Sequence, residues 1–143
     1  MQLYIGSDHA GFDMKEMLKG FLQQNGYTVT DKGTYNNEST DYPDYAHAVA
    51  LAVEADHDSL GILLCGSANG VCITANKHQG IRAALCWTDE VAKLARSHND
   101  ANVICIPARF VDDNLAWEML HSFLTTPFEG GRHQRRVDKI ACA

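Results

Sequence analysis

The chain has 143 residues, of which 45% are hydrophobic and 21% are charged, and its formal net charge is −6. The length fits one globular domain, and the acidic balance argues against a general nucleic-acid binder. No apolar stretch reaches the length of a membrane span and no basic leader precedes the first strand, so we expect a cytoplasmic protein without a membrane partner.

In chain order, short apolar segments alternate with helical patterns. The expected elements are a strand at 3–5, a helix at 12–24, a strand at 28–30, a polar loop at 32–44, a helix at 45–55, a strand at 60–64, a helix running to about 77, a strand at 81–86, a helix at 89–97, a strand at 103–106 and a helix at 111–124. Gly26 takes the position of a C-cap glycine after the first helix.

Five strands separated by helices predict an α/β fold in which a parallel sheet carries helices on both faces. We expect a three-layer αβα sandwich with a five-stranded, doubly wound, Rossmann-like sheet. No linker or repeat interrupts the chain, so residues 1–143 are expected to form one domain with a basic C-terminal tail at 130–143. In such sheets ligands bind beyond the carboxyl ends of the strands.

The cysteines and histidines show no metal or disulfide pattern. There are five cysteines, an odd number, and no two are spaced as CxxC. The seven histidines include no HxxxH pair. We therefore expect no disulfide framework and no bound metal.

Cys65 ends the third strand, and the five residues after it, 66–70, have the composition of a tight turn that opens a helix. The N–H groups and dipole at the start of a helix stabilise negative charge, which favours a thiolate over a thiol. Such a thiolate can remove a proton from carbon beside a turn that holds the resulting oxyanion. The alternative is a buried structural cysteine. Val71 stands where a phosphocysteine phosphatase needs arginine, which disfavours that mechanism.

Three further polar clusters have both a structural and a functional interpretation. Asp8 and His9 follow the first strand, where Asp8 can cap a helix and the pair can bind hydroxyls or an anion, two roles that can coexist. His98 lies in a polar helix end, a position that also suits a cation beside the dipole. Arg132 and Arg136 lie in a basic segment that is either a solvated tail or a phosphate clamp, because guanidinium groups match phosphate oxygens.

Together and in this order, these clusters resemble the type B ribose-5-phosphate isomerase family, which also contains the galactose-6-phosphate isomerase subunits. The resemblance runs from Leu3 to about Val137. It rests on collinear segments: SDHAGF at 7–12, TDYP at 40–43, CGS at 65–67, ANK at 75–77, GIRA at 80–83, SHNDANV at 97–103 and EGGRH at 129–133.

The resemblance implies interconversion of D-ribose 5-phosphate and D-ribulose 5-phosphate through a cis-enediolate, without metal or organic cofactor. Cys65 corresponds to the base that moves a proton between C1 and C2, and Ser67 and His98 to residues that assist opening of the furanose ring. The substrate-binding positions that it implies are Asp8, His9, Tyr42, Gly66, Ala68, Asn69, Gly70, Asn99, Arg109, Arg132 and Arg136. A six-carbon substrate, galactose 6-phosphate or allose 6-phosphate, and a non-catalytic sugar-phosphate-binding protein remain alternatives.

The turn after Cys65 departs from both patterns of the family. One branch has the cysteine and reads Cys-Gly-Thr-Gly-Val-Gly, and the other lacks it and places a glutamate base after Asn-Gly. This chain keeps Cys65, has Ala68 in place of a glycine, and has Val71 in place of the glutamate. Valine cannot accept a proton, which leaves Cys65 as the base at this turn.

The order of the elements also predicts the quaternary structure. His98 ends a helix that returns the chain to the amino edge of the sheet, whereas Cys65 lies at the carboxyl edge. A strand of about six residues spans ~20 Å, which is too far for both to touch one sugar. We therefore expect His98 to act from a neighbouring subunit, in a homodimer or a dimer of dimers with shared active sites.

Overall fold

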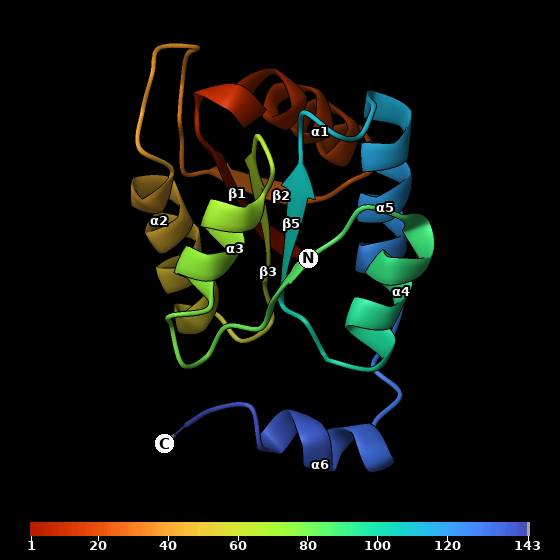
Figure 1. Ribbon diagram of the computed structural model, residues 1–143. Coiled ribbons are helices and arrows are strands. Elements are labelled where there is room, and N and C mark those ends of the chain that lie inside the picture. Colours follow the sequence, from red (N-terminus) through yellow and green to blue (C-terminus); the bar gives the residue numbers. More distant parts are fainter. Residues whose placement is uncertain (143) are drawn as a thin grey trace.

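Five parallel strands form one sheet in the order β2-β1-β3-β5-β4 in the computed structural model, which describes residues 1–142 (Figure 1). The strands are β1 (Gln2–Ser7), β2 (Thr28–Asp31), β3 (Leu60–Cys65), β4 (Ala83–Leu85) and β5 (Val103–Pro107). The helices are the 3₁₀ turn η1 (His9–Gly11), α1 (Phe12–Gln24), α2 (Tyr42–Ala55), α3 (Asn69–Ala75), α4 (Asp89–Ser97), α5 (Asp113–Thr125) and α6 (Arg132–Asp138).

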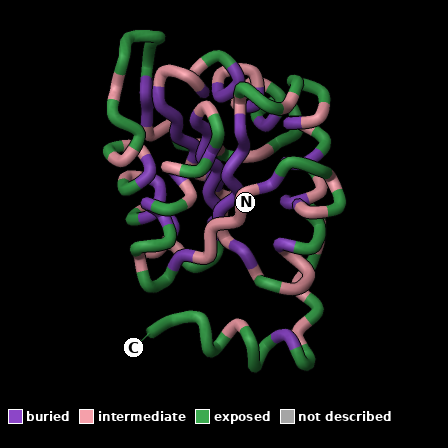
Figure 2. Tube along the Cα trace, in the orientation of Figure 1, coloured by how far each residue is buried: buried purple, intermediate pink, exposed green. Residues whose placement is uncertain are grey.

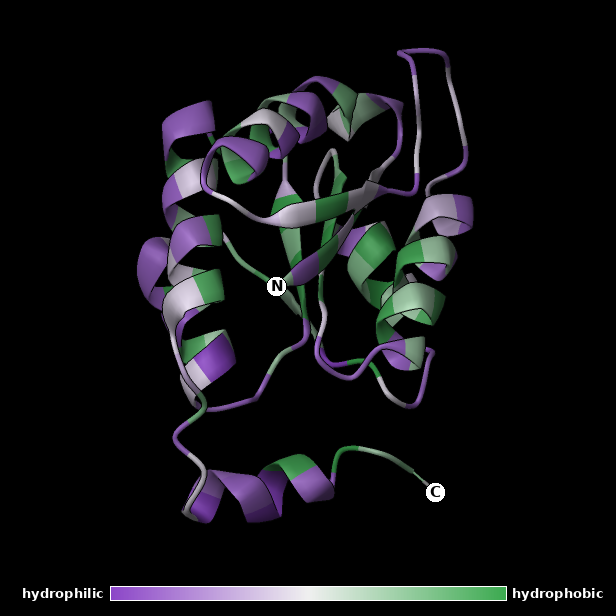
Figure 3. Cartoon of the chain, turned by 180° about the vertical axis from the view of Figure 1, so that it is seen from behind, coloured by the Kyte–Doolittle hydropathy of each residue, from purple (hydrophilic) through white to green (hydrophobic). Residues whose placement is uncertain are grey.

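Helices cover both faces of the sheet, so the predicted α/β sandwich with five parallel strands is confirmed. One core packs α1, α4 and α5 against the sheet, and the other packs α2 and α3 against the opposite face. Figure 2 shows the central strands β1, β3 and β5 as mostly buried, and Figure 3 shows the hydrophobic residues of α2 and α3 beside the sheet. None of the helices in the described part of the chain is long and apolar enough to cross a bilayer.

Alternation along β3 decides which face receives the Cys65 side chain. Ile62 and Leu64 belong to the core under α1, α4 and α5, whereas Leu63 and Cys65 belong to the core under α2 and α3. Successive side chains of a strand point to opposite faces, and both faces of this strand are covered, so the whole run is apolar. The thiol therefore lies on the α2–α3 side of the sheet.

The element boundaries differ from the sequence prediction at several ends. Helix α2 begins at Tyr42 rather than at 45, with Pro43 in its first turn, where a proline costs no hydrogen bond. Helix α5 begins at Asp113, because the Asp112 carboxylate accepts the Leu115 N–H at 2.8 Å and caps the helix there. Strand β4 is limited to three residues, and α3 ends at Ala75.

The tail expected at 130–143 contains helix α6, and residue 143 lies outside the described residues. Figure 1 shows β5 pointing upward and α6 set apart below the amino edge of the sheet. The carboxyl edge, at the top of that view, therefore lies at the opposite end of the molecule from α6.

Candidate active site

Residues from four connections meet at the carboxyl edge of the sheet. In the sheet, Ser7 of β1 lies beside Leu64 of β3, and Cys65 of β3 lies beside Pro107 of β5. Three neighbouring strands therefore end at the same level. The segments that follow them enclose a cavity of about 290 Å³, which we call the Cys65 cavity. It is lined by Asp8, His9, Ala10, Tyr42, Cys65, Gly66, Ser67, Gly70 and Arg109.

Cys65 is only 5% exposed, yet it lines this cavity. Its carbonyl accepts the Ala108 N–H at 3.0 Å, and the Gly66 carbonyl accepts the Arg109 N–H at 3.0 Å. On the other side, the Asp8 N–H donates to the Leu64 carbonyl at 3.4 Å. The turn that carries the thiol is thus bonded to the connections after β1 and β5, which fixes its place between them.

The turn at 66–70 has an unusual backbone. Ala68 has a φ of +64°, in the left-handed region that costs a non-glycine residue about 1 kcal/mol, and its side chain is fully buried. The Ser67 hydroxyl accepts hydrogen bonds from the Asn69 N–H at 3.3 Å and from its side-chain amide at 3.2 Å. Ala68 and Asn69 belong to the turn but are not among the residues that line the cavity.

Asp8 caps the turn after β1 and also lines the Cys65 cavity. One carboxylate oxygen accepts the Ala10 N–H at 3.0 Å and the Gly11 N–H at 3.2 Å, which caps the 3₁₀ turn. The same side chain lines the Cys65 cavity. Gly11 is required here, because a Cβ on it would stand 2.7 Å from the Leu64 Cβ. The turn can approach β3 this closely only with glycine at that position.

The ring of His9 is oriented by a contact that the sequence did not reveal. Its Nδ1 accepts the Thr40 N–H at 3.2 Å, across the long loop between β2 and α2. An Nδ1 that accepts carries no proton, so the neutral ring keeps its proton on Nε2 as a donor. The polarity of the loop and its TDYP segment were the only sequence signals for this contact.

Two glycines allow larger side chains to lie over the turn. A Cβ on Gly66 would stand 3.1 Å from Arg109 Nη1, and a Cβ on Gly70 would overlap the Tyr42 ring. Among residues 1–142, Arg109 forms no ion pair with a carboxylate. Its guanidinium donors are therefore not occupied by a carboxylate of the described chain, and guanidinium groups suit anionic ligands in general.

The remaining thiols near the sheet do not line this cavity, and two of them are poor bases. Burial raises the pKa of Cys86 to about 12, and burial also holds the pKa of Cys105 well above its usual value. Both remain protonated at neutral pH. A hydrogen bond with the Cys105 thiol lowers the pKa of Cys72, whose own thiol lies 3.4 Å from the Ala83 carbonyl, outside the cavity. Of Cys65, Cys72, Cys86 and Cys105, only Cys65 lines the cavity that Arg109 also lines.

Four of the expected site residues lie elsewhere. His98 follows the last residue of α4, and the carbonyl of Ser97 beside it accepts the Glu129 N–H at 3.0 Å. Asn99 comes next, and Arg132 and Arg136 are exposed on α6, one turn apart. All four positions belong to the amino-edge end of the molecule, away from Cys65 (Figure 1).

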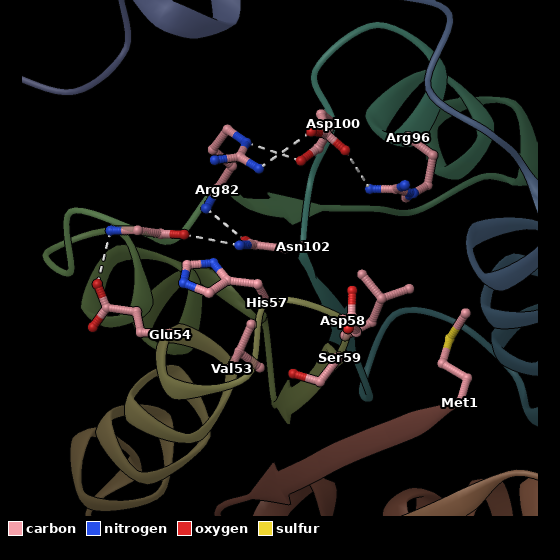
Figure 4. Close-up of a pocket in the computed structure, with 12 residues that line it drawn as sticks. Met1, Val53, Glu54, His57, Asp58, Ser59, Arg82, Arg96, Asp100 and Asn102 are labelled. Carbon is pink, nitrogen blue, oxygen red and sulfur yellow. Dashed lines mark hydrogen bonds and ion pairs between the residues drawn. The ribbon is translucent and has the colours of Figure 1, made fainter.

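A larger cavity, of about 490 Å³, opens at that amino edge (Figure 4). Figure 4 shows Arg82 and Arg96 directed at Asp100, and the shortest ion-pair distances are 3.5 Å and 3.0 Å. Both guanidinium groups are thus already paired, and Glu54 and Asp58 add further carboxylates. This cavity suits a phosphate poorly and has no cysteine in its lining, so the smaller cavity is the candidate active site.

Comparison with known proteins gives full-length matches. A family model described as Ribose/Galactose Isomerase matches residues 3–140. Ribose-5-phosphate isomerase B of Escherichia coli K12 is 45% identical over 139 residues, which cover 97% of this chain and 93% of that protein. A crystal structure of a ribose 5-phosphate isomerase from Thermotoga maritima matches with a TM-score of 0.97 and 48% identity, covering 99% of this chain and 98% of the other. Ribose-5-phosphate isomerase B from Mycoplasma genitalium, solved with bound ribulose-5-phosphate, matches with a TM-score of 0.94 and 45% identity, covering 97% and 93%.

Proposed function

This chain belongs to the Ribose/Galactose Isomerase family, and we propose that it interconverts D-ribose 5-phosphate and D-ribulose 5-phosphate with Cys65 as the base. The observation that carries this proposal is the Cys65 cavity. A thiol, a carboxylate, an imidazole and a guanidinium group line the same space of about 290 Å³, which is the size of a small-ligand site. A structural cysteine would have no need of these neighbours.

The proposed step moves one proton between two carbons. In the direction of ketose formation, the Cys65 thiolate takes the proton from C2 of the open-chain sugar. The electron pair of the C2–H bond forms the C1=C2 double bond of the enediolate, and the C1 oxygen takes the negative charge. The thiol then returns the proton to C1 while the hydroxyl proton passes from O2 to O1. No electrons leave the sugar, so no redox cofactor is required.

The turn at 66–70 supplies donors for the enediolate oxygens. Helix α3 begins four residues after Cys65, and since the Ser67 hydroxyl takes the Asn69 N–H, the N–H groups of Gly70 and Val71 are the ones without a partner within the helix. Loss of one such donor typically costs roughly 3 kcal/mol of transition-state stabilisation. Ser67 assists ring opening beside the thiol. Asp8 accepts hydrogen bonds from the sugar hydroxyls with the oxygen that does not cap the 3₁₀ turn.

The phosphate binds between two copies of the chain. His9 and Arg109 contribute donors from the subunit that holds Cys65. His98, Asn99, Arg132 and Arg136 reach the same sugar phosphate from the neighbouring subunit, because in their own chain they lie at the amino edge. Binding energy from the phosphate fixes the sugar relative to the sulfur and excludes water from the cavity.

The substrate assignment is tested with a panel of sugar phosphates. We expect ribose 5-phosphate to give the highest kcat/KM, and galactose 6-phosphate and allose 6-phosphate to be at least about tenfold poorer, since one extra carbon in a tight pocket changes binding by ~1–3 kcal/mol. Free ribose serves as the control for the phosphate contacts. Faster turnover of either six-carbon sugar would overturn the five-carbon assignment and leave the isomerase chemistry standing.

Gly70→Ala tests whether the Tyr42 ring and the turn belong to the site. The added methyl group overlaps the ring, so we expect kcat/KM to fall by at least about tenfold, because overpacking costs ~1–3 kcal/mol. The same overpacking should lower the melting temperature by a few degrees, because alanine recovers only about 1 kcal/mol of helix propensity, so kinetics are measured well below the unfolding transition. The matched control is Gly20→Ala in α1, where a Cβ meets nothing within 4 Å and activity should be unchanged. Wild-type kinetics in Gly70→Ala would show that the Tyr42 ring and the turn do not belong to the substrate site.

A further inference from the structure

Three potential metal ligands meet at the amino edge, although the sequence predicted no metal. His98 follows α4, whereas Glu129 and His133 come from the start of the tail. One nitrogen of each histidine and one oxygen of the glutamate all lie within 4.8 Å of one another. Because His98 and Glu129 are 31 residues apart, the cluster does not form a motif of closely spaced ligands in the sequence.

The distances in the cluster approach those around a tetrahedral zinc ion. Zinc–nitrogen and zinc–oxygen bonds are about 2.0–2.1 Å, so two ligand atoms at a tetrahedral angle stand about 3.3 Å apart. His133 Nε2 lies 3.3 Å from Glu129 Oε2, and His98 Nε2 lies 3.9 Å from the same oxygen. The first distance already fits, and the second requires that the partly exposed His98 side chain shift by about half an ångström and turn out of its stack on His133.

Backbone contacts hold the two segments together before any ion binds. The Glu129 N–H donates to the Ser97 carbonyl at 3.0 Å, which joins the tail to the end of α4. The His98 and His133 rings stack, with centroids 4.2 Å apart and an interplanar angle of 14°, so one ring must turn before the in-plane lone pairs of both can converge on one ion. The side chain of His133 is 11% exposed, whereas those of His98 and Glu129 are 39% and 57% exposed. The cluster therefore has one fixed ligand and an open approach from solvent.

We propose that His98, Glu129 and His133 form a binding site for a divalent transition-metal ion of the zinc type, with the fourth position open. Two neutral imidazoles and one carboxylate are a ligand set that zinc accepts, and they replace water molecules bound to the hydrated ion. The ion inhibits rather than assists the reaction, because a metal-bound His98 nitrogen cannot donate or accept a proton. This consequence for turnover rests on the proposed role of His98 in ring opening.

The site is tested by zinc titration of the full-length protein against a chromogenic chelator. Exposed Cys142 is replaced by serine throughout, and the titration is repeated with Cys65→Ala, so that neither thiol contributes. We expect one zinc ion per chain, and at least about tenfold weaker binding by Glu129→Gln and by His133→Gln, since each loses one of three ligands. His121→Gln, which alters an exposed histidine outside the cluster, is the matched control and should bind as the parent does.

Equal zinc affinity in the parent and in both ligand variants would overturn the site, as would failure of the parent to compete with the chelator. Turnover is measured separately. Zinc should inhibit the parent at the concentration at which it binds, with reversal by EDTA, and should not inhibit Glu129→Gln over that range. Binding to this cluster without inhibition would leave the metal site standing and would contradict the role of His98 in catalysis.

Discussion

Cys65→Ala is expected to abolish the interconversion of ribose 5-phosphate and ribulose 5-phosphate while leaving sugar-phosphate binding largely intact. A positioned base typically contributes 10²–10⁴-fold to the rate, so kcat should fall by about that factor. In the proposed complex the phosphate and hydroxyl contacts come from other side chains that line the cavity, among them His9, Arg109 and Asp8, which the substitution does not touch. Steady-state kinetics give kcat, and calorimetric titration with the substrate gives the dissociation constant.

Cys65→Ser is the matched control, because it keeps the size of the side chain and replaces only the sulfur. A serine hydroxyl ionises far less readily than a thiol, so the loss of kcat should be nearly as large. Thermal unfolding should show both variants folded, since only one buried atom is removed or exchanged. Near-normal turnover in either variant would refute the assignment of the base.

Mixing two inactive variants should restore activity if each site draws on two subunits. Cys65→Ala removes the base, and His98→Ala removes the partner's ring-opening group. In a twofold dimer, a mixed pair contains one site with both residues and one site with neither. Random exchange in an equal mixture makes half of the dimers mixed, so about one quarter of wild-type activity is expected.

The mixing experiment requires proof that the subunits exchange. Differently tagged Cys65→Ala and His98→Ala chains should co-purify after incubation, and activity should rise with the fraction of mixed dimers. The control mixture combines Cys65→Ala with Cys65→Ser, in which no arrangement regenerates a complete site. Exchange without any recovery of activity in the first mixture would show that His98 does not serve the neighbouring subunit's cavity.

Much of the carboxyl-edge site could be predicted from the sequence, because parallel strands fix which connections meet. Once Leu3 to Ile5 and Leu60 to Leu64 are recognised as strands, Asp8 and Cys65 must emerge at the same edge. Arg109 follows from the fifth strand in the same way. The opposite location of His98 also follows, since a helix between parallel strands returns the chain to the amino edge.

Other features depended on contacts that no local pattern encodes. The hydrogen bond from Thr40 to His9 spans 31 residues and is made by a loop without regular structure. Tyr42 belongs to the first turn of α2, three residues before the predicted start, which is how its ring comes to lie against Gly70. The cluster of His98, Glu129 and His133 depends on the path of the chain after α5, where the sequence shows only a glycine pair and a basic segment.

The most direct test of the Cys65 assignment is the exchange of deuterium into ribulose 5-phosphate in heavy water. This ketose cannot close a furanose ring, because its C5 oxygen carries the phosphate, so proton transfer at C1 is observed without the ring-opening step. The wild-type protein and His98→Ala should both introduce deuterium at C1, whereas Cys65→Ala should introduce none above the uncatalysed background. Deuterium uptake by Cys65→Ala at the wild-type rate would show that another group moves the proton.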